Sequence, residues 1–122
     1  MMLMPTTKTH NQKVGKWGEQ RAIDELVAKG YKIIRRNVYT PYGEVDLIAQ
    51  NGDGLVFIEV KTRTNDTFGQ PELAVNAKKY GHFANAAAFI AQEMQASNYR
   101  LDVIAILGKP GQEPEITHFE NI

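Results

Sequence analysis

The sequence of 122 residues contains no cysteine. A chain without thiols forms no disulfide, has no thiolate nucleophile and offers no sulfur ligands to zinc or iron. Long hydrophobic runs are also missing: the longest strictly apolar stretch, residues 86–91, has six residues, whereas a membrane-spanning helix takes about 18 or more. The apolar start at residues 1–4 meets Pro5 too early for the roughly 7–15-residue core of a secretory signal. These absences predict a cytoplasmic protein without membrane contact.

The chain has no excess of either charge, because 14 basic residues balance 14 acidic ones. A neutral total argues against coating nucleic acid by bulk electrostatics. The charges are nevertheless uneven: residues 8–36 carry +5, residues 37–60 carry −4, residues 61–100 carry +2 and residues 101–122 carry −3. An acidic centre between basic flanks is typical of a metal-using site that acts on a polyanion. Chance along a short chain would give the same pattern, so both interpretations stay open here.

The length and composition are those of one domain. Residues 1–11 show no periodicity and are expected to form a flexible N-terminal arm, which leaves residues 12–122 as a single domain. Helical periodicity predicts helices at residues 12–29 and 72–95. Strands are predicted at residues 31–39, 44–50, 55–63 and 100–107, with a short final strand at 115–119. This order predicts an α/β fold in which helices flank one mixed sheet.

Each predicted helix has an apolar face that is expected to lie on the sheet. In the first helix, Glu19 falls in the middle of that face. In the second helix, the face expected to pack comprises Leu73, Ala77, Tyr80, Ala84, Ala87, Ala88, Ala91 and Met94.

The register of the predicted hairpin can be calculated. Symmetric closure around the turn at residues 51–54 pairs residues whose numbers sum to 105. Asp46 is then expected to face Glu59, and Glu44 to face Lys61. Because side chains alternate across a sheet, these four project from one face. The opposed pair Ile48 and Phe57 is expected further along that same face.

Two carboxylates directly opposite each other destabilise a sheet, so Asp46 and Glu59 require compensation. A hard divalent cation would supply it, since Mg²⁺ binds carboxylate oxygens and phosphate oxygens while keeping water ligands. Lys61 would orient a water molecule or stabilise charge on a phosphate, and Glu19 is a further candidate ligand. The alternative is a solvated strand face in which Asp46 pairs with a basic residue.

Four segments in this order resemble the bacterial YraN-like family, and the resemblance covers about residues 12–107. The segments are GEQRA at 18–22, NVYTPYGEVDLI at 37–48, VFIEVKTR at 56–63 and RLDV at 100–103. That family has the restriction-endonuclease-like fold and is similar to archaeal Holliday-junction resolvases. The resemblance therefore implies an αβββαβ core, with a mixed sheet flanked by helices.

The resemblance also implies a PD-(D/E)XK site. Asp46 matches the first acidic position, Glu59 the second and Lys61 the lysine, while Glu19 matches the helix carboxylate of resolvase-like members. One departure is that Glu44-Val45-Asp46 replaces a literal Pro-Asp.

The leading hypothesis is an endonuclease that uses Mg²⁺ or Mn²⁺ to hydrolyse DNA, including branched or structured DNA. Its catalytic residues would be Glu19, Asp46, Glu59 and Lys61, of which the three carboxylates would bind the metal. Two alternatives remain, a nucleic-acid-binding module with little turnover and a protein-interaction adaptor that keeps the fold. No small-molecule cofactor is expected, and the similarity to resolvases implies a homodimer.

Other residues support weaker hypotheses. Phosphate contacts are expected from basic residues, although exposed basic side chains are usually only solubilising; the candidates are Arg63, Lys78, Lys79, His82 and Arg100. Trp17 and Tyr42 could stack on bases, but packing is the commoner role of aromatic side chains. The histidines show no metal-ligand spacing and are expected at the surface: His10, His82 and His118.

Overall fold

The secondary-structure elements follow the predicted order. The structure is a computed structural model that describes residues 10–64 and 77–122. Its elements are α1 (His10–Ala28), β1 (Lys32–Thr40), β2 (Gly43–Asn51), β3 (Gly54–Arg63), α2 (Ala77–Glu93), β4 (Tyr99–Leu107) and β5 (Glu115–Phe119). The αβββαβ order implied by the family resemblance is thus confirmed, and a fifth strand follows it.

The helix boundaries differ from the predicted ones. Helix α1 begins at His10, two residues before the predicted start, and the rest of the expected arm lies outside the described residues. Residues 72–76 of the second predicted helix also lie outside them. Within the described ranges, neither helix is long and apolar enough to span a membrane.

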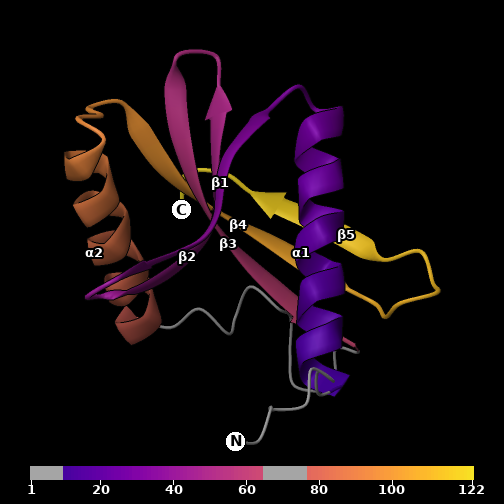
Figure 1. The fold of residues 1–122 in the computed structure, drawn as a ribbon. Coiled ribbons are helices and arrows are strands. Elements are labelled where there is room, and N and C mark those ends of the chain that lie inside the picture. The colour runs from indigo at the N-terminus through magenta and orange to yellow at the C-terminus, as the bar shows by residue number, and fades with distance from the viewer. Residues whose placement is uncertain (1–9, 65–76) are drawn as a thin grey trace, which may run out of the picture.

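The five strands form one sheet in the order β1-β2-β3-β4-β5 (Figure 1). Strands β3 and β4 run parallel, whereas the other three neighbouring pairs are antiparallel. A parallel pair requires a crossover connection, and α2 lies in the segment that connects β3 with β4. The sheet is therefore mixed, and its parallel pair includes the central strand, β3.

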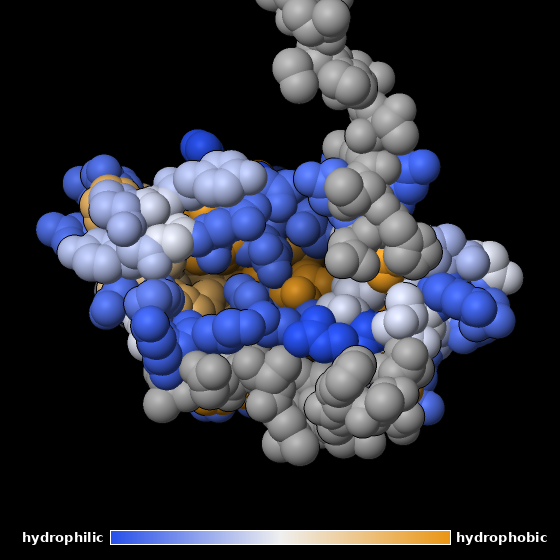
Figure 2. Space-filling model, turned by 90° about the horizontal axis from the view of Figure 1, so that it is seen from below, coloured by the Kyte–Doolittle hydropathy of each residue, from blue (hydrophilic) through white to orange (hydrophobic). Residues whose placement is uncertain are grey.

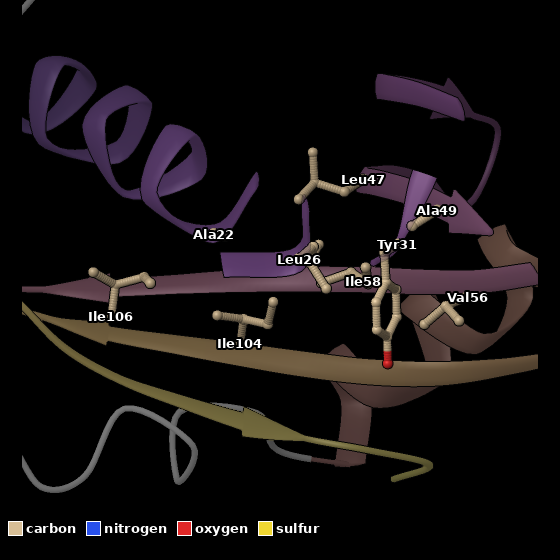
Figure 3. Close-up of a cluster of buried hydrophobic side chains, with 9 residues drawn as sticks. All are labelled: Ala22, Leu26, Tyr31, Leu47, Ala49, Val56, Ile58, Ile104 and Ile106. Atoms are coloured by element: carbon tan, nitrogen blue, oxygen red, sulfur yellow. The ribbon is translucent and has the colours of Figure 1, made fainter. Parts of the chain in front are cut away.

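The two helices cover opposite faces of the sheet (Figure 1). On one face, Ala22 and Leu26 of α1 join a buried cluster with strand residues (Figure 3). The other members of this cluster are Tyr31, Leu47, Ala49, Val56, Ile58, Ile104 and Ile106. On the other face, residues of α2 pack against Val45, Ile48, Phe57 and Leu101. Both faces are therefore buried along the middle of the sheet.

The predicted packing face of α2 is only partly correct. Ala87 and Ala91 are buried as predicted. Tyr80, Ala88 and Met94 were expected beside them but are exposed. The helix is instead rotated so that Phe83 and Ile90 face the sheet. These large side chains remove more apolar surface from water than alanines do, so they decide the rotation.

Candidate functional site

The β2–β3 ladder ends close to the predicted acidic residues. Its pairs run from Asn51–Gly54 to Leu47–Ile58, so the predicted register is confirmed over this stretch. The next pairs in that register, Asp46–Glu59 and Glu44–Lys61, are not formed, and this part of the prediction is wrong. Beyond this point β2 remains paired with β1, while β3 remains paired with β4 as far as Arg63–Leu107. The two strands therefore separate where the acidic residues begin.

Asp46 occupies the gap between the separating strands. Its carboxylate Oδ2 accepts a hydrogen bond of 2.8 Å from the backbone N–H of Val60. In a continued ladder this N–H would face Val45 of β2 instead. Val45 packs on the α2 side of the sheet and Leu47 on the α1 side, although strict alternation would place both on one side. The regular alternation of side chains along β2 is therefore interrupted at Asp46. The hydrogen bond from Val60 of β3 holds the Asp46 side chain in place.

Strand β1 is also irregular beside Asp46. Its pairing passes from Arg36–Leu47 to Val38–Val45, which leaves Asn37 opposite Asp46. Asn37 has a φ of 52°, a left-handed conformation that asparagine tolerates better than most residues. Regular pairing is therefore interrupted on both sides of this carboxylate.

Two adjoining cavities meet at the gap, at the end of the molecule where α1 begins and β3 ends. The cavity on the α1 side has a volume of about 510 Å³, and the cavity on the α2 side about 290 Å³. Glu44, Asp46 and Lys61 line both of them, whereas Glu19 lines the first and Glu59 the second. The structure therefore brings the predicted site residues to one place, with Glu19 and Glu59 on different sides of Asp46.

The view from this end shows mostly hydrophilic side chains on the described surface (Figure 2). They surround a recess in which hydrophobic side chains are visible. The charged side chains that line the two cavities suit a charged ligand better than an apolar one.

Glu19 is placed by a close approach of α1 to β3. At Gly18, an added Cβ would overlap the side chain of Thr62, so glycine is required for this packing distance. The half-buried Glu19 follows directly and faces the α1-side cavity. Lys16, three residues earlier and on the same side of the helix, lines the cavity as well.

The site concentrates negative charge. Burial, the nearby charge of Glu59 and weaker contributions from Glu19 and Glu44 raise the pKa of Asp46 to about 7, against the opposing effect of the Val60 hydrogen bond. Burial, together with the charges of Glu19 and Glu59, also raises the pKa of Glu44. Ionisation of Asp46 is therefore much less favourable in the folded protein than in water.

Lys61 supplies positive charge beside this group. Its Nζ lies 3.2 Å from Oε2 of Glu59, and the side chains are only 13% and 23% exposed respectively. A cation held in this way can donate hydrogen bonds to an anionic ligand in either cavity.

The chemistry of the donors fits a hard divalent cation. Carboxylate oxygens are the ligands that Mg²⁺ prefers, and this ion usually keeps several water ligands. Within the described residues, no group of three or more histidine and acidic side chains converges closely enough to hold a metal ion. Any cation here would thus be held by few protein ligands, with water or phosphate completing its coordination.

The predicted phosphate-binding residues are scattered. Arg63 lines the α1-side cavity. Lys78 is exposed on α2 and lines neither cavity, whereas its neighbour Lys79 lines the α2-side cavity together with His82. Lys79 and His82 were also predicted as phosphate contacts, whereas Lys16 was not, although its spacing from Glu19 was an available signal.

Arg100 lies away from the acidic site. It pairs with Val56, near the hairpin end of β3, and its guanidinium donates to Asp102 at 3.0 Å and to the hydroxyl of Tyr31 at 2.7 Å. Asp102 is fully buried and is also 2.7 Å from Nε2 of His118. The His118 side chain is only 3% exposed, so its expected surface position is wrong.

Fold and site together define an α/β protein whose half-buried acidic site lies where two strands of a mixed sheet separate. Residues 18–106 match the family described as "Uncharacterised protein family UPF0102". The chain belongs to this family, which confirms the YraN-like resemblance.

Relatives match over almost the whole chain. The UPF0102 protein of Thermodesulfovibrio yellowstonii is 46% identical over 110 residues, which cover 89% of this chain and 94% of the relative. The UPF0102 protein of Trichlorobacter lovleyi is 42% identical over 121 residues, covering 97% and 95%. Among solved structures, Hjc, a Holliday junction resolvase from Archaeoglobus fulgidus, matches with a TM-score of 0.42 and 19% identity, over 83% of this chain and 84% of that chain.

Proposed function

We propose that residues 12–122 form a single nuclease-like domain that hydrolyses phosphodiester bonds of DNA with the help of Mg²⁺ or Mn²⁺. The observation that carries this proposal is the environment of Asp46. Its carboxylate is held by the Val60 N–H at 2.8 Å, has a pKa raised to about 7 by burial and neighbouring carboxylates, and lies beside Lys61 in both cavities. A site that concentrates negative charge in this way favours a bound cation.

Each site residue has a distinct proposed role. Asp46 and Glu59 would hold the metal ion, with water or phosphate completing its coordination, and Glu19 would add negative charge from the α1 side of Asp46. A bound Mg²⁺ or Mn²⁺ would polarise a phosphate oxygen of the substrate. Lys61, held against Glu59 at 3.2 Å, would donate a hydrogen bond to the phosphate or orient the attacking water.

Basic side chains around the site support a polyanionic substrate. Lys16 and Arg63 line the α1-side cavity, and Lys79 lines the α2-side cavity. Phosphate contacts from lysine and arginine provide most of the sequence-independent affinity for DNA. The resemblance to junction resolvases extends the proposal to branched DNA and to a homodimer, because a two-fold enzyme suits a symmetric junction.

The test is a cleavage assay on single-stranded, duplex, flap and four-way DNA, with Mg²⁺ or Mn²⁺ against EDTA. We expect metal-dependent cleavage by the wild type and none by Asp46→Asn. Asp53→Asn is the matched control, because Asp53 is exposed in the turn between β2 and β3; this variant should cut as the wild type does.

The other outcomes separate the alternatives. If the wild type binds DNA but cuts none of these substrates in Mn²⁺, a nucleic-acid-binding module becomes the better description. If it binds no DNA at all, a protein-interaction adaptor takes its place.

A further inference from the structure

Two tyrosines are exposed at the turn between β1 and β2. Tyr39 is 77% exposed and Tyr42 50%, which makes Tyr39 the most exposed large aromatic side chain in the described part of the chain. Exposed aromatic rings gain free energy when a partner covers them. Tyr39 and Tyr42 are therefore candidates for direct contact with a binding partner.

The tyrosines flank the acidic site on its two sides. Tyr39 lines the α1-side cavity and Tyr42 the α2-side cavity, while Asp46 and Lys61 line both. A ligand held at Asp46 and Lys61 would thus extend toward one ring or the other.

The turn that carries the tyrosines is held by its own hydrogen bonds. The Thr40 hydroxyl donates to the Gly43 carbonyl at 2.7 Å and accepts from the Tyr42 N–H at 3.0 Å. Gly43 has a φ of 136°, a conformation that glycine adopts readily. The Tyr42 ring also packs edge-on against Phe89, with centroids 6.2 Å apart. Because the turn is already ordered, binding through it would cost little conformational entropy.

The surroundings of Tyr39 favour a partner that is both planar and anionic. Lys16 and Arg63 line the same cavity as Tyr39 and are suited to phosphate groups. The Tyr39 hydroxyl interacts with the carboxylate of Glu44, which lowers the pKa of Glu44 against the larger effect of burial. Nucleotides combine a flat base with a phosphate, and stacking of bases on aromatic side chains is a common mode of single-strand recognition.

We infer that Tyr39 and Tyr42 stack on unpaired DNA bases beside the cleaved phosphate, so that the protein prefers DNA with unpaired bases to continuous duplex. This inference rests on the proposed function. In a duplex the base faces are already covered by their neighbours, whereas bases at a flap or branch are free to stack on a side chain. Tyr39 is the principal stacking residue, because Phe89 already contacts part of Tyr42.

The test is a binding assay in Ca²⁺ with a flap DNA that carries 2-aminopurine in its unpaired arm, compared with the matching duplex. The wild type should quench the 2-aminopurine fluorescence and bind the flap more tightly. Tyr39→Ala should lose the quenching and bind the flap about tenfold more weakly, with its duplex affinity unchanged. Tyr39→Phe keeps the ring and should behave as the wild type.

Tyr99→Ala is the control for position, because Tyr99 is an exposed aromatic residue paired with Leu55 near the opposite end of β3. It should leave both affinities unchanged once circular dichroism has shown that the variant is folded. Quenching and flap affinity that persist in the Tyr39→Ala/Tyr42→Ala double variant would overturn the stacking proposal alone. Failure of the wild type to bind any DNA would overturn the proposed function and the stacking proposal together.

Discussion

Asp46 combines burial, three neighbouring carboxylates and a single backbone hydrogen bond. Its pKa is raised from 3.8 to about 7, because ionisation in the folded protein is unfavourable. Between these two values the folded state binds more protons than the unfolded state does. The free energy of unfolding should therefore fall as the pH rises from about 4 to about 7.

Asp46→Asn should remove this pH dependence. Asparagine keeps an oxygen that accepts from the Val60 N–H but cannot ionise. In EDTA at pH 8 we expect the variant to be more stable than the wild type by roughly 2–4 kcal/mol, and at pH 4 to be nearly equal to it. Urea denaturation at the two pH values measures this. The exposed Asp53→Asn should change stability at either pH by less than about 0.5 kcal/mol; an Asp46→Asn effect of equal size at both pH values would contradict the pKa assignment.

Lys61→Ala should separate catalysis from binding. One phosphate contact among several contributes little affinity, whereas a group that acts on the developing charge is needed for turnover. We expect cleavage to be lost with DNA affinity nearly unchanged. Arg63→Ala should do the reverse and reduce the salt dependence of binding by about one counterion. The two variants are compared by filter binding over a salt series and by a cleavage assay. Normal cleavage by Lys61→Ala would contradict the proposed catalytic role of Lys61.

At the residue scale, the sequence predicted that Asp46, Glu59 and Lys61 lie close together because they belong to one hairpin, although the calculated pair Asp46–Glu59 is not formed. It could not predict the role of Arg100. The guanidinium reaches Tyr31, 69 residues earlier in the chain, and His118 lies 16 residues from Asp102. Such contacts depend on the assembled sheet, and no local periodicity reports them.

Helix α1 and strand β3 meet at a point where only glycine fits. The sequence placed Glu19 on the apolar face of a helix, but it did not show which strand the helix touches. The structure assigns that contact to Thr62 of β3. Because Glu19 follows Gly18 directly, the packing of the two elements also sets the position of the carboxylate.

Gly18→Ala should therefore destabilise the protein, although alanine favours helices. Overlap of the new methyl group with Thr62 should cost about 1–3 kcal/mol. Gly15→Ala is the matched control in the same helix. Nothing lies within 4 Å of an added Cβ there, so it should stabilise by up to about 1 kcal/mol. Thermal unfolding of both variants measures these changes in stability. Stabilisation by Gly18→Ala would contradict the prediction, because it would show that α1 can move away from Thr62 without cost.

The hairpin shows where prediction from local sequence ends. Its turn residues predicted the register correctly as far as Leu47–Ile58. The separation beyond this pair depends on β1 and β4, which hold the two strands on their outer sides. In α2, counting apolar positions gave too much weight to alanines, and the larger Phe83 and Ile90 determined the rotation instead.

In the whole molecule, a buried network that joins distant segments lies apart from the acidic site. Asp102 accepts hydrogen bonds from Arg100 and the Asn121 backbone and is paired with His118. Lys29, just after α1, contacts the other ring nitrogen of His118 at 3.0 Å. Burial alone would raise the pKa of Asp102, but the hydrogen bonds outweigh it and lower that pKa. The network therefore stabilises the fold with Asp102 ionised.

Asp102→Asn should test whether this network stabilises the fold without taking part in DNA binding. Loss of the buried charge leaves Arg100 and His118 without their anionic partner and should cost about 3–5 kcal/mol of stability. DNA affinity, measured at a temperature where the variant is folded, should be unchanged, because the network lies away from both cavities. Arg100→Ala should likewise reduce stability and leave DNA affinity intact. If the folded Arg100→Ala variant instead lost DNA affinity, the predicted phosphate contact of Arg100 would be supported.

The order of the strands along the sheet determines how the chain folds. Hairpins β1–β2 and β2–β3 close through short connections and should form within microseconds, whereas β3 and β4 are separated by a long stretch of chain that includes α2, so their pairing closes a larger loop. Pulse-labelled hydrogen exchange should thus protect amides of Leu47 and Ala49 before those of Ile104 and Ile106. Asp46 and Glu59 belong to the early part, so these two carboxylates should come together while still hydrated. The desolvation of Asp46, whose pKa is raised to about 7, should follow later, when the helices dock, and it should slow that last step more at pH 8 than at pH 5.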